Sequence, residues 1–171
     1  MKQLMILFGV ILYIAPIQVQ AQKTKVQTAW NYYKYDELDK AKTAIDEASV
    51  NETTMGMAKT WYYKGLIYQK MHKHEKYGNL DPNCLYVAND AYNKALEIEP
   101  KYEFAQEIDQ NKKYIYSEIY GQGVKKFNAK DFNSALSDFE YLLKVDPSDT
   151  LAVLNAAYSA DKAGNKEKAK N

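Results

Sequence analysis

The chain contains no arginine, two histidines and one cysteine among its 171 residues. Every one of its 23 basic residues is therefore a lysine. Arginine supplies the bidentate contacts that recognise phosphates and bases, so its absence makes nucleic acid a poor candidate partner. With Cys84 as the lone cysteine, no internal disulfide can form. A single thiol in an oxidising compartment either pairs with another chain or is buried, and we expect burial for Cys84.

Long apolar runs are also lacking. Residues 4–15 are nearly all apolar, Pro16 ends the run, and Val19 and Ala21 place small residues where a signal peptidase reads them. This is the anatomy of a secretory signal peptide, residues 1–21. The run is too short to cross a membrane comfortably, although an uncleaved anchor is the alternative. We expect an exported protein, periplasmic or at the cell surface, whose mature chain of residues 22–171 is uncharged overall and has no membrane span.

A small residue, an aromatic one turn later and an Asp-Pro or Glu-Pro stop recur along the chain. The full pattern is Ala135, Phe139, Leu142 and Pro147, and it repeats as Ala88, Tyr92, Ala95 and Pro100. Ala41, Ile45 and Ala48 repeat its first three positions, and Ala169 lies 34 residues after Ala135. A second small residue precedes three of the copies by 12 positions, at Ala29, Gly123 and Ala157. Gly65 precedes Ala88 by 23, which indicates an insertion of 11 residues.

This periodicity predicts stacked pairs of antiparallel helices. Small residues on both helices of a pair let the backbones approach closely, and the aromatic residues fill the space between pairs. No single pair can bury its apolar face alone, so neighbouring pairs must stack. The alternative is an ordinary antiparallel helical bundle, which has the helices but not the regular stack.

One copy resembles the tetratricopeptide repeat, through Trp61, Gly65, Tyr68, Ala88, Tyr92, Ala95 and Pro100, with Lys64 departing from the usual Leu. The resemblance implies an all-α, tetratricopeptide-type α-solenoid of helix hairpins in a right-handed superhelical stack. The implied units are residues 22–54, 55–101, 102–148 and 149–171. Because the last hairpin is incomplete, we interpret the sequence as a fragment of a longer protein. The signal segment, the lysine-only basic residues and the many tyrosines resemble exported repeat proteins of the Bacteroidetes.

The pattern also predicts where the helices lie. We expect them at residues 25–35, 38–48, 55–73, 82–99, 102–128, around Ala135 up to Asp146-Pro147, and at 150–163, with a further start at 166–171. Asp81 is the expected N-cap of the helix that begins at Pro82, and Asp149 or Ser148 that of the helix that begins at Thr150.

The sequence contains only weak matches to motifs for metal binding, phosphate binding or catalysis. His72, His74 and Glu75, with Cys84 further on, are poorly spaced to bind a metal from one helix face. Gly121 and Gly123 form a Gly-x-Gly without a preceding strand or a third glycine, so we expect close helix packing and not a phosphate loop. No catalytic constellation emerges, and we expect no catalytic, cofactor or metal-binding residues.

The resemblance implies a concave groove lined by the first helix of each pair. The groove positions are Trp30, Tyr33, Lys34, Tyr62, Leu66, Gln69, Lys70, Tyr120, Val124, Phe127, Tyr158 and Lys162. Val26, Tyr62 and Tyr120 occupy the places where some family members carry a lysine that clamps a carboxylate tail, so the clamp is not expected here. Aromatic residues interspersed with lysines suit an extended peptide or a partner helix. The alternative is that several of these side chains only pack between hairpins.

The sequence therefore favours a non-enzymatic scaffold or assembly module that binds a protein or peptide partner. Two other hypotheses stay open. The chain is the helical accessory region of a larger enzyme or regulator, or it binds carbohydrate or another small ligand in a tyrosine-rich groove.

Overall fold

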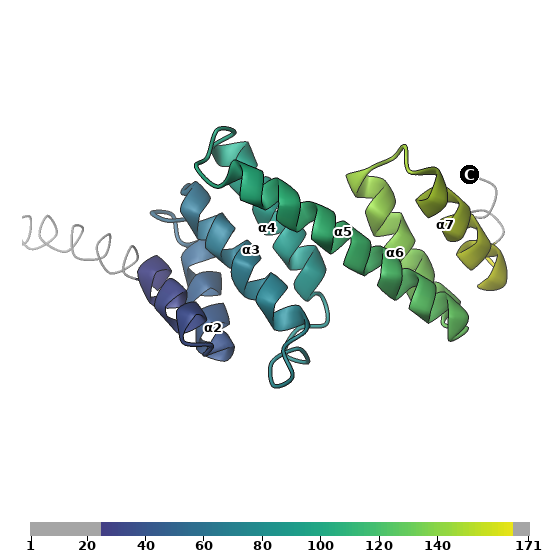
Figure 1. Cartoon of the computed structure of the whole chain (residues 1–171), viewed down its shortest axis with the longest axis horizontal. Coiled ribbons are helices and arrows are strands. Elements are labelled where there is room, and N and C mark those ends of the chain that lie inside the picture. The colour runs from purple at the N-terminus through teal and green to yellow at the C-terminus, as the bar shows by residue number, and fades with distance from the viewer. Residues whose placement is uncertain (1–24, 166–171) are drawn as a thin grey trace, which may run out of the picture. The chain divides into compact units, whose positions relative to one another are not determined.

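The structure, a computed structural model, describes residues 25–165. Within that range every regular element is a helix, which confirms the all-α prediction (Figure 1). Residues 25–34 form the first helical segment, and the labelled helices follow in chain order as α2 (Leu38–Val50), α3 (Ala58–His72), α4 (Cys84–Ile98), α5 (Ala105–Asn128), α6 (Phe132–Val145) and α7 (Thr150–Lys162). The predicted signal peptide, residues 1–21, and the predicted helix start at 166–171 lie outside the described residues.

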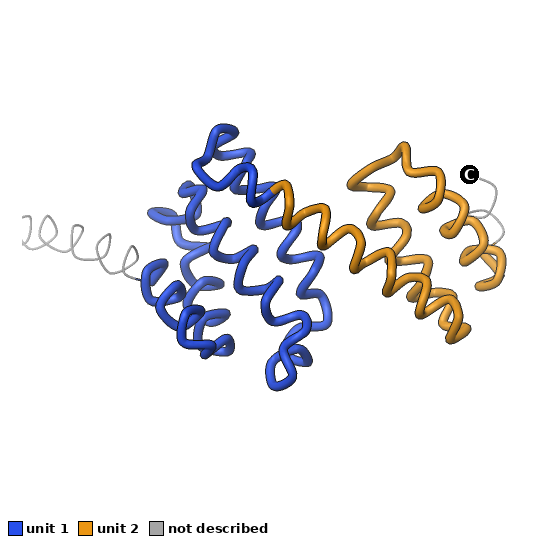
Figure 2. The backbone as a smooth tube through the Cα atoms, viewed as in Figure 1, with its two compact units in different colours: residues 1–108 blue, residues 109–171 orange. Residues whose placement is uncertain are grey.

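The chain divides into two compact units, residues 1–108 and 109–171, coloured separately in Figure 2. In unit 1, α2 packs against α3, and α3 packs against α4. In unit 2, α6 and α7 pack against each other. The division falls inside α5, whose first residues belong to unit 1 and whose remainder belongs to unit 2.

Close contact between a glycine and an aromatic ring occurs in both units. In unit 1, a Cβ added to Gly65 of α3 would stand 2.3 Å from Cε1 of Tyr92 in α4. In unit 2, a Cβ added to Gly123 of α5 would stand 2.9 Å from Cε1 of Phe139 in α6. Both rings are completely buried. These contacts join the small and aromatic positions that recur in the sequence, so the close-packing prediction is confirmed for Gly65 and Gly123.

Gly121 does not share this role. Nothing lies within 4 Å of where its Cβ would be, and the residue is exposed. Two residues along a helix lie on different sides of it, so Gly121 faces away from the ring that Gly123 contacts. The prediction that Gly121 serves close packing is therefore wrong.

Three turns between helices share one geometry at one place in the repeat. Asp36, Lys130 and Gly164 each have a positive φ, of 61°, 64° and 79°. Each lies five residues before Ala41, Ala135 or Ala169, the small residue that opens the recurring pattern. After each helix, the next backbone N–H returns to the carbonyl five residues back: Glu37 to Tyr32 at 3.0 Å, Asp131 to Lys126 at 3.0 Å and Asn165 to Ala160 at 2.8 Å. This is the hydrogen bonding of a Schellman cap, which satisfies carbonyls at the helix end.

The starts of three helices differ from those predicted. α3 begins at Ala58 and not at residue 55, because a turn in which Met55 N–H donates to Asn51 O at 2.8 Å precedes it. α4 begins at Cys84 and not at Pro82. Asp81 forms a turn of its own, in which Oδ1 accepts from Asn83 N–H at 2.9 Å, so the predicted Asp81 cap is wrong.

The third difference is at α5, which begins at Ala105 and not at residue 102. Tyr102 lies before the helix and is buried among aromatic rings of unit 1. The Asp149 cap is confirmed, since its Oδ1 accepts from Leu151 N–H at 2.8 Å and Ala152 N–H at 3.1 Å.

Cys84 lies in the core of unit 1, where it is 1% exposed and its thiol donates to Asp81 O at 2.9 Å. The predicted burial of Cys84 is confirmed. Among residues 25–165, none of the helices is both long enough and apolar enough to cross a membrane.

Candidate interaction surface

A row of stacked aromatic rings joins the first helical segment to α3 in unit 1. The ring of Trp30 lies 4.6 Å from that of Tyr63, with an interplanar angle of 11°. On the same segment, Trp30 stacks on Tyr33 at 5.1 Å and 18°. Trp30 and Tyr33 are half-buried, so they are held in place by packing while part of their surface faces solvent. Rigid, partly exposed Trp and Tyr side chains are the residue types that most often anchor protein partners.

Two lysines of α3 lie over these rings. Lys59 Nζ is 5.4 Å from the centre of the Tyr63 ring, and Lys70 Nζ is 4.8 Å from the centre of the Tyr33 ring. Cation–π contacts of this length orient the lysines along the rings. We call the set Trp30, Tyr33, Tyr63, Lys59 and Lys70 the aromatic–lysine face.

An acidic residue fixes one end of this face. Lys70 Nζ is 2.7 Å from Oδ1 of Asp36, and His74 Nε2 is 2.9 Å from Oδ2 of the same carboxylate. The hydrogen bonds from Lys70 and then His74 hold the pKa of Asp36 below its ordinary value. Burial raises the pKa of Tyr33, and this outweighs the opposing effect of Lys70, so its hydroxyl stays neutral at physiological pH. The face thus carries a fixed ion pair beside uncharged aromatic rings.

The other groove positions of unit 1 are divided between core and surface. Tyr62 is only 4% exposed and stacks on Phe104 at 4.7 Å and 5°, so it packs inside the unit. Gln69 Oε1 accepts from the Tyr92 hydroxyl at 2.8 Å, which also turns Gln69 toward the core. Leu66 is half-buried and Lys34 is exposed. Of the predicted groove positions in unit 1, the structure brings Trp30, Tyr33 and Lys70 together on one face.

In unit 2 two of the predicted groove positions, both on α5, contact residues of neighbouring helices. The Tyr120 hydroxyl accepts from Asn155 Nδ2 at 2.8 Å, which ties α5 to α7. Phe127 packs edge to face on Phe132 at 5.2 Å. The remaining positions of this unit are Val124, which is half-buried, and Tyr158 and Lys162, which are exposed.

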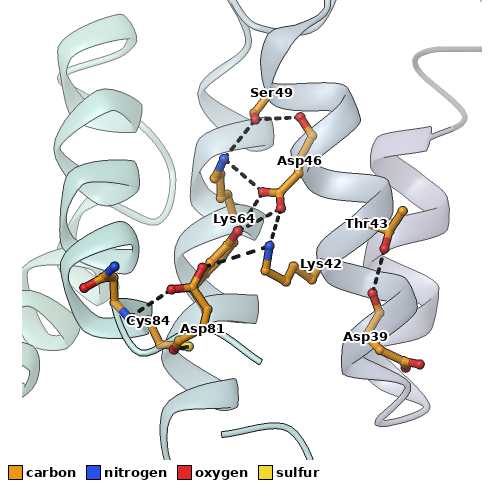
Figure 3. A network of polar contacts seen from close by, with 10 residues as sticks. Asp39, Lys42, Thr43, Asp46, Ser49, Lys64, Asp81 and Cys84 are labelled. Carbon is orange, nitrogen blue, oxygen red and sulfur yellow. Dashed lines mark hydrogen bonds and ion pairs between the residues drawn. The ribbon is translucent and has the colours of Figure 1, made fainter. Parts of the chain in front are cut away.

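A polar network between α2 and α3 was not predicted from the sequence (Figure 3). The carboxylate of Asp46 accepts from the Tyr68 hydroxyl at 2.8 Å and lies 2.8 Å from Lys42 Nζ and 3.0 Å from Lys64 Nζ. Lys64 also donates to Ser49 Oγ at 3.0 Å. Burial alone would raise the pKa of Asp46, but the hydrogen bonds from Lys42, Tyr68 and Lys64 outweigh it and lower the pKa. Its donors come from both helices, Lys42 from α2 and Lys64 and Tyr68 from α3, so this network holds α2 against α3.

The sequence does contain signals for some of the residues in this unpredicted network. Lys42 and Asp46 are four apart on one helix, which is the spacing of an ion pair. Lys64 stands where the resembled family has Leu, and the structure shows why a lysine is accommodated there: its head reaches Asp46 of the neighbouring helix. Nothing local in the sequence pairs Asp36 with Lys70 and His74, which are more than 30 residues away.

Among residues 25–165, no group of three or more His, Cys, Asp or Glu side chains is placed to hold a metal. Unit 2 has an open depression of about 500 Å³, lined by Asp109, Lys112, Lys113, Tyr116, Val145 and Asp146. Burial and then Asp149, which accepts a hydrogen bond from the Tyr116 hydroxyl, raise the pKa of Tyr116, so this phenol is a poor base or nucleophile.

Comparison of the chain with models of protein families found no match, and comparison with curated proteins found none either. Its function therefore has to be inferred from its own residues.

Proposed function

We propose that this chain is a non-enzymatic protein-interaction module that binds an extended peptide or a partner helix on its aromatic–lysine face. The observation that carries the proposal is the stacked row of Trp30, Tyr33 and Tyr63, half-buried at Trp30 and Tyr33 and flanked by lysines. Such rings lose little conformational entropy when a partner binds, because packing already holds them.

The lysines indicate which charged group the partner should carry. Lys70 is already paired with Asp36, whereas Lys59 has a cation–π contact and Lys34 is exposed nearby on the first helical segment. A partner segment with one apolar or aromatic side chain for the rings and a carboxylate for Lys59 or Lys34 would use both features. The charged contact would add mainly to the rate and specificity of association.

The proposal extends to the architecture. A tetratricopeptide-type solenoid is supported by the Schellman turns at Asp36, Lys130 and Gly164 and by the matched contacts of Gly65 with Tyr92 and Gly123 with Phe139. Solenoids of helix pairs present one face of successive first helices to a partner. We also propose that residues 1–21 direct the chain to the periplasm or cell surface, where it serves as a scaffold or assembly factor.

Binding of a peptide array of mixed sequence tests the function. Residues Trp30 and Trp61 are the two tryptophans of the chain, so binding at the face should also change tryptophan fluorescence. Trp30→Ala should weaken the best peptides at least 10-fold, as expected for an anchor residue. Tyr35→Ala is the matched control, because Tyr35 is 78% exposed just beyond the same helical segment and has no ring contact with the face.

Circular dichroism of each variant shows whether the fold is kept. Peptides that bind Trp30→Ala and Tyr35→Ala with equal affinity would place binding elsewhere and overturn the proposal. Saturable binding of an oligosaccharide in place of peptides, also lost in Trp30→Ala, would assign the same face to carbohydrate.

A further inference from the structure

The longest connection in unit 1 contacts the end of the aromatic–lysine face. Residues 73–83 connect α3 to α4, whereas only residues 35–37 separate the first helical segment from α2. The connection contains the insertion of 11 residues that the spacing of the sequence indicates. One of its side chains, His74, lies against Asp36 in the shorter turn. The insertion therefore makes a contact that a connection of ordinary length would not reach.

The imidazole of His74 is held on three sides. Its Nε2 lies 2.9 Å from Oδ2 of Asp36, and its Nδ1 accepts from the backbone N–H of Lys76 at 3.2 Å. The ring also packs on that of Tyr77, with 4.7 Å between the ring centres. Tyr77 is itself buried, so it gives the imidazole a fixed support. These contacts fix both the position and the orientation of the His74 ring.

The two hydrogen bonds also determine which nitrogen carries the proton. A backbone N–H can only donate, so Nδ1 of His74 accepts and carries no proton. An ionised carboxylate can only accept, so Nε2 carries the proton and donates to Asp36. The carboxylate stays ionised because the hydrogen bonds from Lys70 and His74 lower the pKa of Asp36. His74 is thus a neutral donor aimed at this carboxylate.

Asp36 links His74 to the binding face. Its other oxygen, Oδ1, is 2.7 Å from Lys70 Nζ, and the same Nζ lies 4.8 Å from the centre of the Tyr33 ring. The Asp36 side chain is 51% exposed, so packing alone does not hold it. Without the donor from His74, the carboxylate could change its rotamer and draw Lys70 away from the ring.

We propose that His74 is a positioning residue for the aromatic–lysine face. Its Nε2–H fixes the Asp36 carboxylate, and the carboxylate keeps Lys70 over the Tyr33 ring. The insertion thereby sets how well one end of the face is ordered before a partner arrives, and a face ordered in advance loses less entropy on binding. The consequence for binding rests on the proposed function, whereas the positioning itself is measured without a partner.

Neighbouring side chains of the insertion do not duplicate this contact. Lys76 Nζ donates to the Tyr77 hydroxyl at 2.9 Å, so its charged end is directed within the insertion. Glu75 is exposed and carries the same charge as Asp36, so it cannot replace a donor there. Glu75→Ala is therefore a matched control, because it changes the residue next to His74 without touching the contact.

Nuclear magnetic resonance of the full chain tests the positioning in the absence of any partner. His74→Ala should raise the pKa of Asp36 toward its ordinary value, because one of its two hydrogen-bond donors is lost. The Lys70 side-chain signals should also lose the upfield shift that the Tyr33 ring causes. His74→Gln retains an N–H donor and should restore part of both effects, and Glu75→Ala should change neither.

A second variant separates the hydrogen bond from ring packing. His74→Phe keeps a ring against Tyr77 but removes the donor, so it should behave as His74→Ala does. Circular dichroism shows whether each variant keeps its helices. If His74→Ala loses helical structure, the comparison of His74→Phe with His74→Gln decides the proposal.

Peptide binding then tests the consequence for the face. The probe is the peptide of the mixed-sequence array that binds the parent chain most tightly, followed by tryptophan fluorescence. His74→Ala and His74→Phe should weaken it about 5-fold, the factor that one hydrogen bond contributes on balance. His74→Gln should recover part of the loss, and Glu75→Ala should bind as the parent does.

The outcomes separate this inference from the proposed function. Unchanged Asp36 titration and unchanged Lys70 signals in both His74→Phe and His74→Ala would overturn the positioning role, whatever the peptides do. Altered signals with unchanged peptide affinity would overturn its consequence for binding. A parent chain that binds no peptide would count against the proposed function, and the resonance measurements would still decide whether His74 positions Lys70.

Discussion

Replacing Gly65, Gly121 and Gly123 with alanine, one at a time, separates helix propensity from packing. All three glycines lie inside helices, so each change should gain about 1 kcal/mol of helix propensity. The three sites differ in what the new methyl group would meet. At Gly121 it meets nothing within 4 Å, at Gly123 it meets the Phe139 ring at 2.9 Å, and at Gly65 it meets the Tyr92 ring at 2.3 Å.

The expected stabilities follow from these distances. Gly121→Ala should raise the free energy of unfolding by about 1 kcal/mol. Overpacking a buried site costs about 1–3 kcal/mol, so Gly123→Ala should be neutral or lower stability by up to about 2 kcal/mol. Gly65→Ala should be the worst, with a net loss of about 2 kcal/mol. Its contact is shortest, and the Tyr92 hydroxyl is tied to Gln69 at 2.8 Å, which restrains the ring from moving aside.

Urea unfolding followed by two signals gives the measurement. Both tryptophans lie in unit 1, so fluorescence reports that unit, while circular dichroism reports the helices of both. Gly65→Ala should shift the fluorescence transition to lower urea. Gly121→Ala should shift the part of the dichroism signal that reports unit 2 to higher urea if the units unfold separately, or the whole transition if they unfold together. A Gly65→Ala protein as stable as Gly121→Ala would refute the packing argument.

Three further predictions concern single side chains. Asp46→Asn should lower stability by about 2 kcal/mol at pH 7, since it weakens charged hydrogen bonds from α3. Because the pKa of Asp46 is lowered by folding, this difference should be complete above the ordinary carboxyl pKa and should vanish as the pH falls through the folded value, which urea titrations between pH 2 and 7 measure. Asp149→Ala should cost about 1–2 kcal/mol through loss of the α7 cap, and a Tm unchanged from the parent would contradict the cap. Burial raises the pKa of Cys84 to about 11, so a thiol reagent at pH 8 should label the native chain on the order of 100-fold more slowly than the chain in urea, and equal rates would show that the site is open.

The helices, and the close contacts between small and aromatic residues, could be predicted because these residues recur in the sequence at fixed spacing. The small residues Ala29, Ala41, Ala88 and Ala135 are all completely buried, as their recurrence indicates. The helix starts were less accurate. A proline after an aspartate is a good start signal in general, but Asp81 uses its side chain in a turn before α4 begins.

The candidate surface was predicted only in part, for a physical reason. The recurrence predicts which positions carry small or aromatic residues. It does not predict whether an aromatic ring at such a position is covered by a later segment of the chain. Tyr62 is covered by Phe104, which comes from an extension that the repeat pattern does not contain. Tyr63 belongs to the stacked row through Trp30, although its position does not recur as an aromatic. Burial of this kind depends on contacts between distant segments, which spacing alone does not encode.

The turn positions show how fold and surface are coupled in this chain. In three of the four copies a left-handed residue lies five positions before the small residue, and glycine takes that conformation at the lowest energy. Gly164 fits this rule, whereas Asp36 and Lys130 carry a side chain at a cost of about 1–2 kcal/mol. For Asp36 the side chain has a use that glycine could not supply, because its carboxylate holds Lys70 and His74 at one end of the aromatic–lysine face. The residue that takes the unfavourable backbone conformation at this turn is therefore also the residue whose contacts order one end of the proposed binding surface.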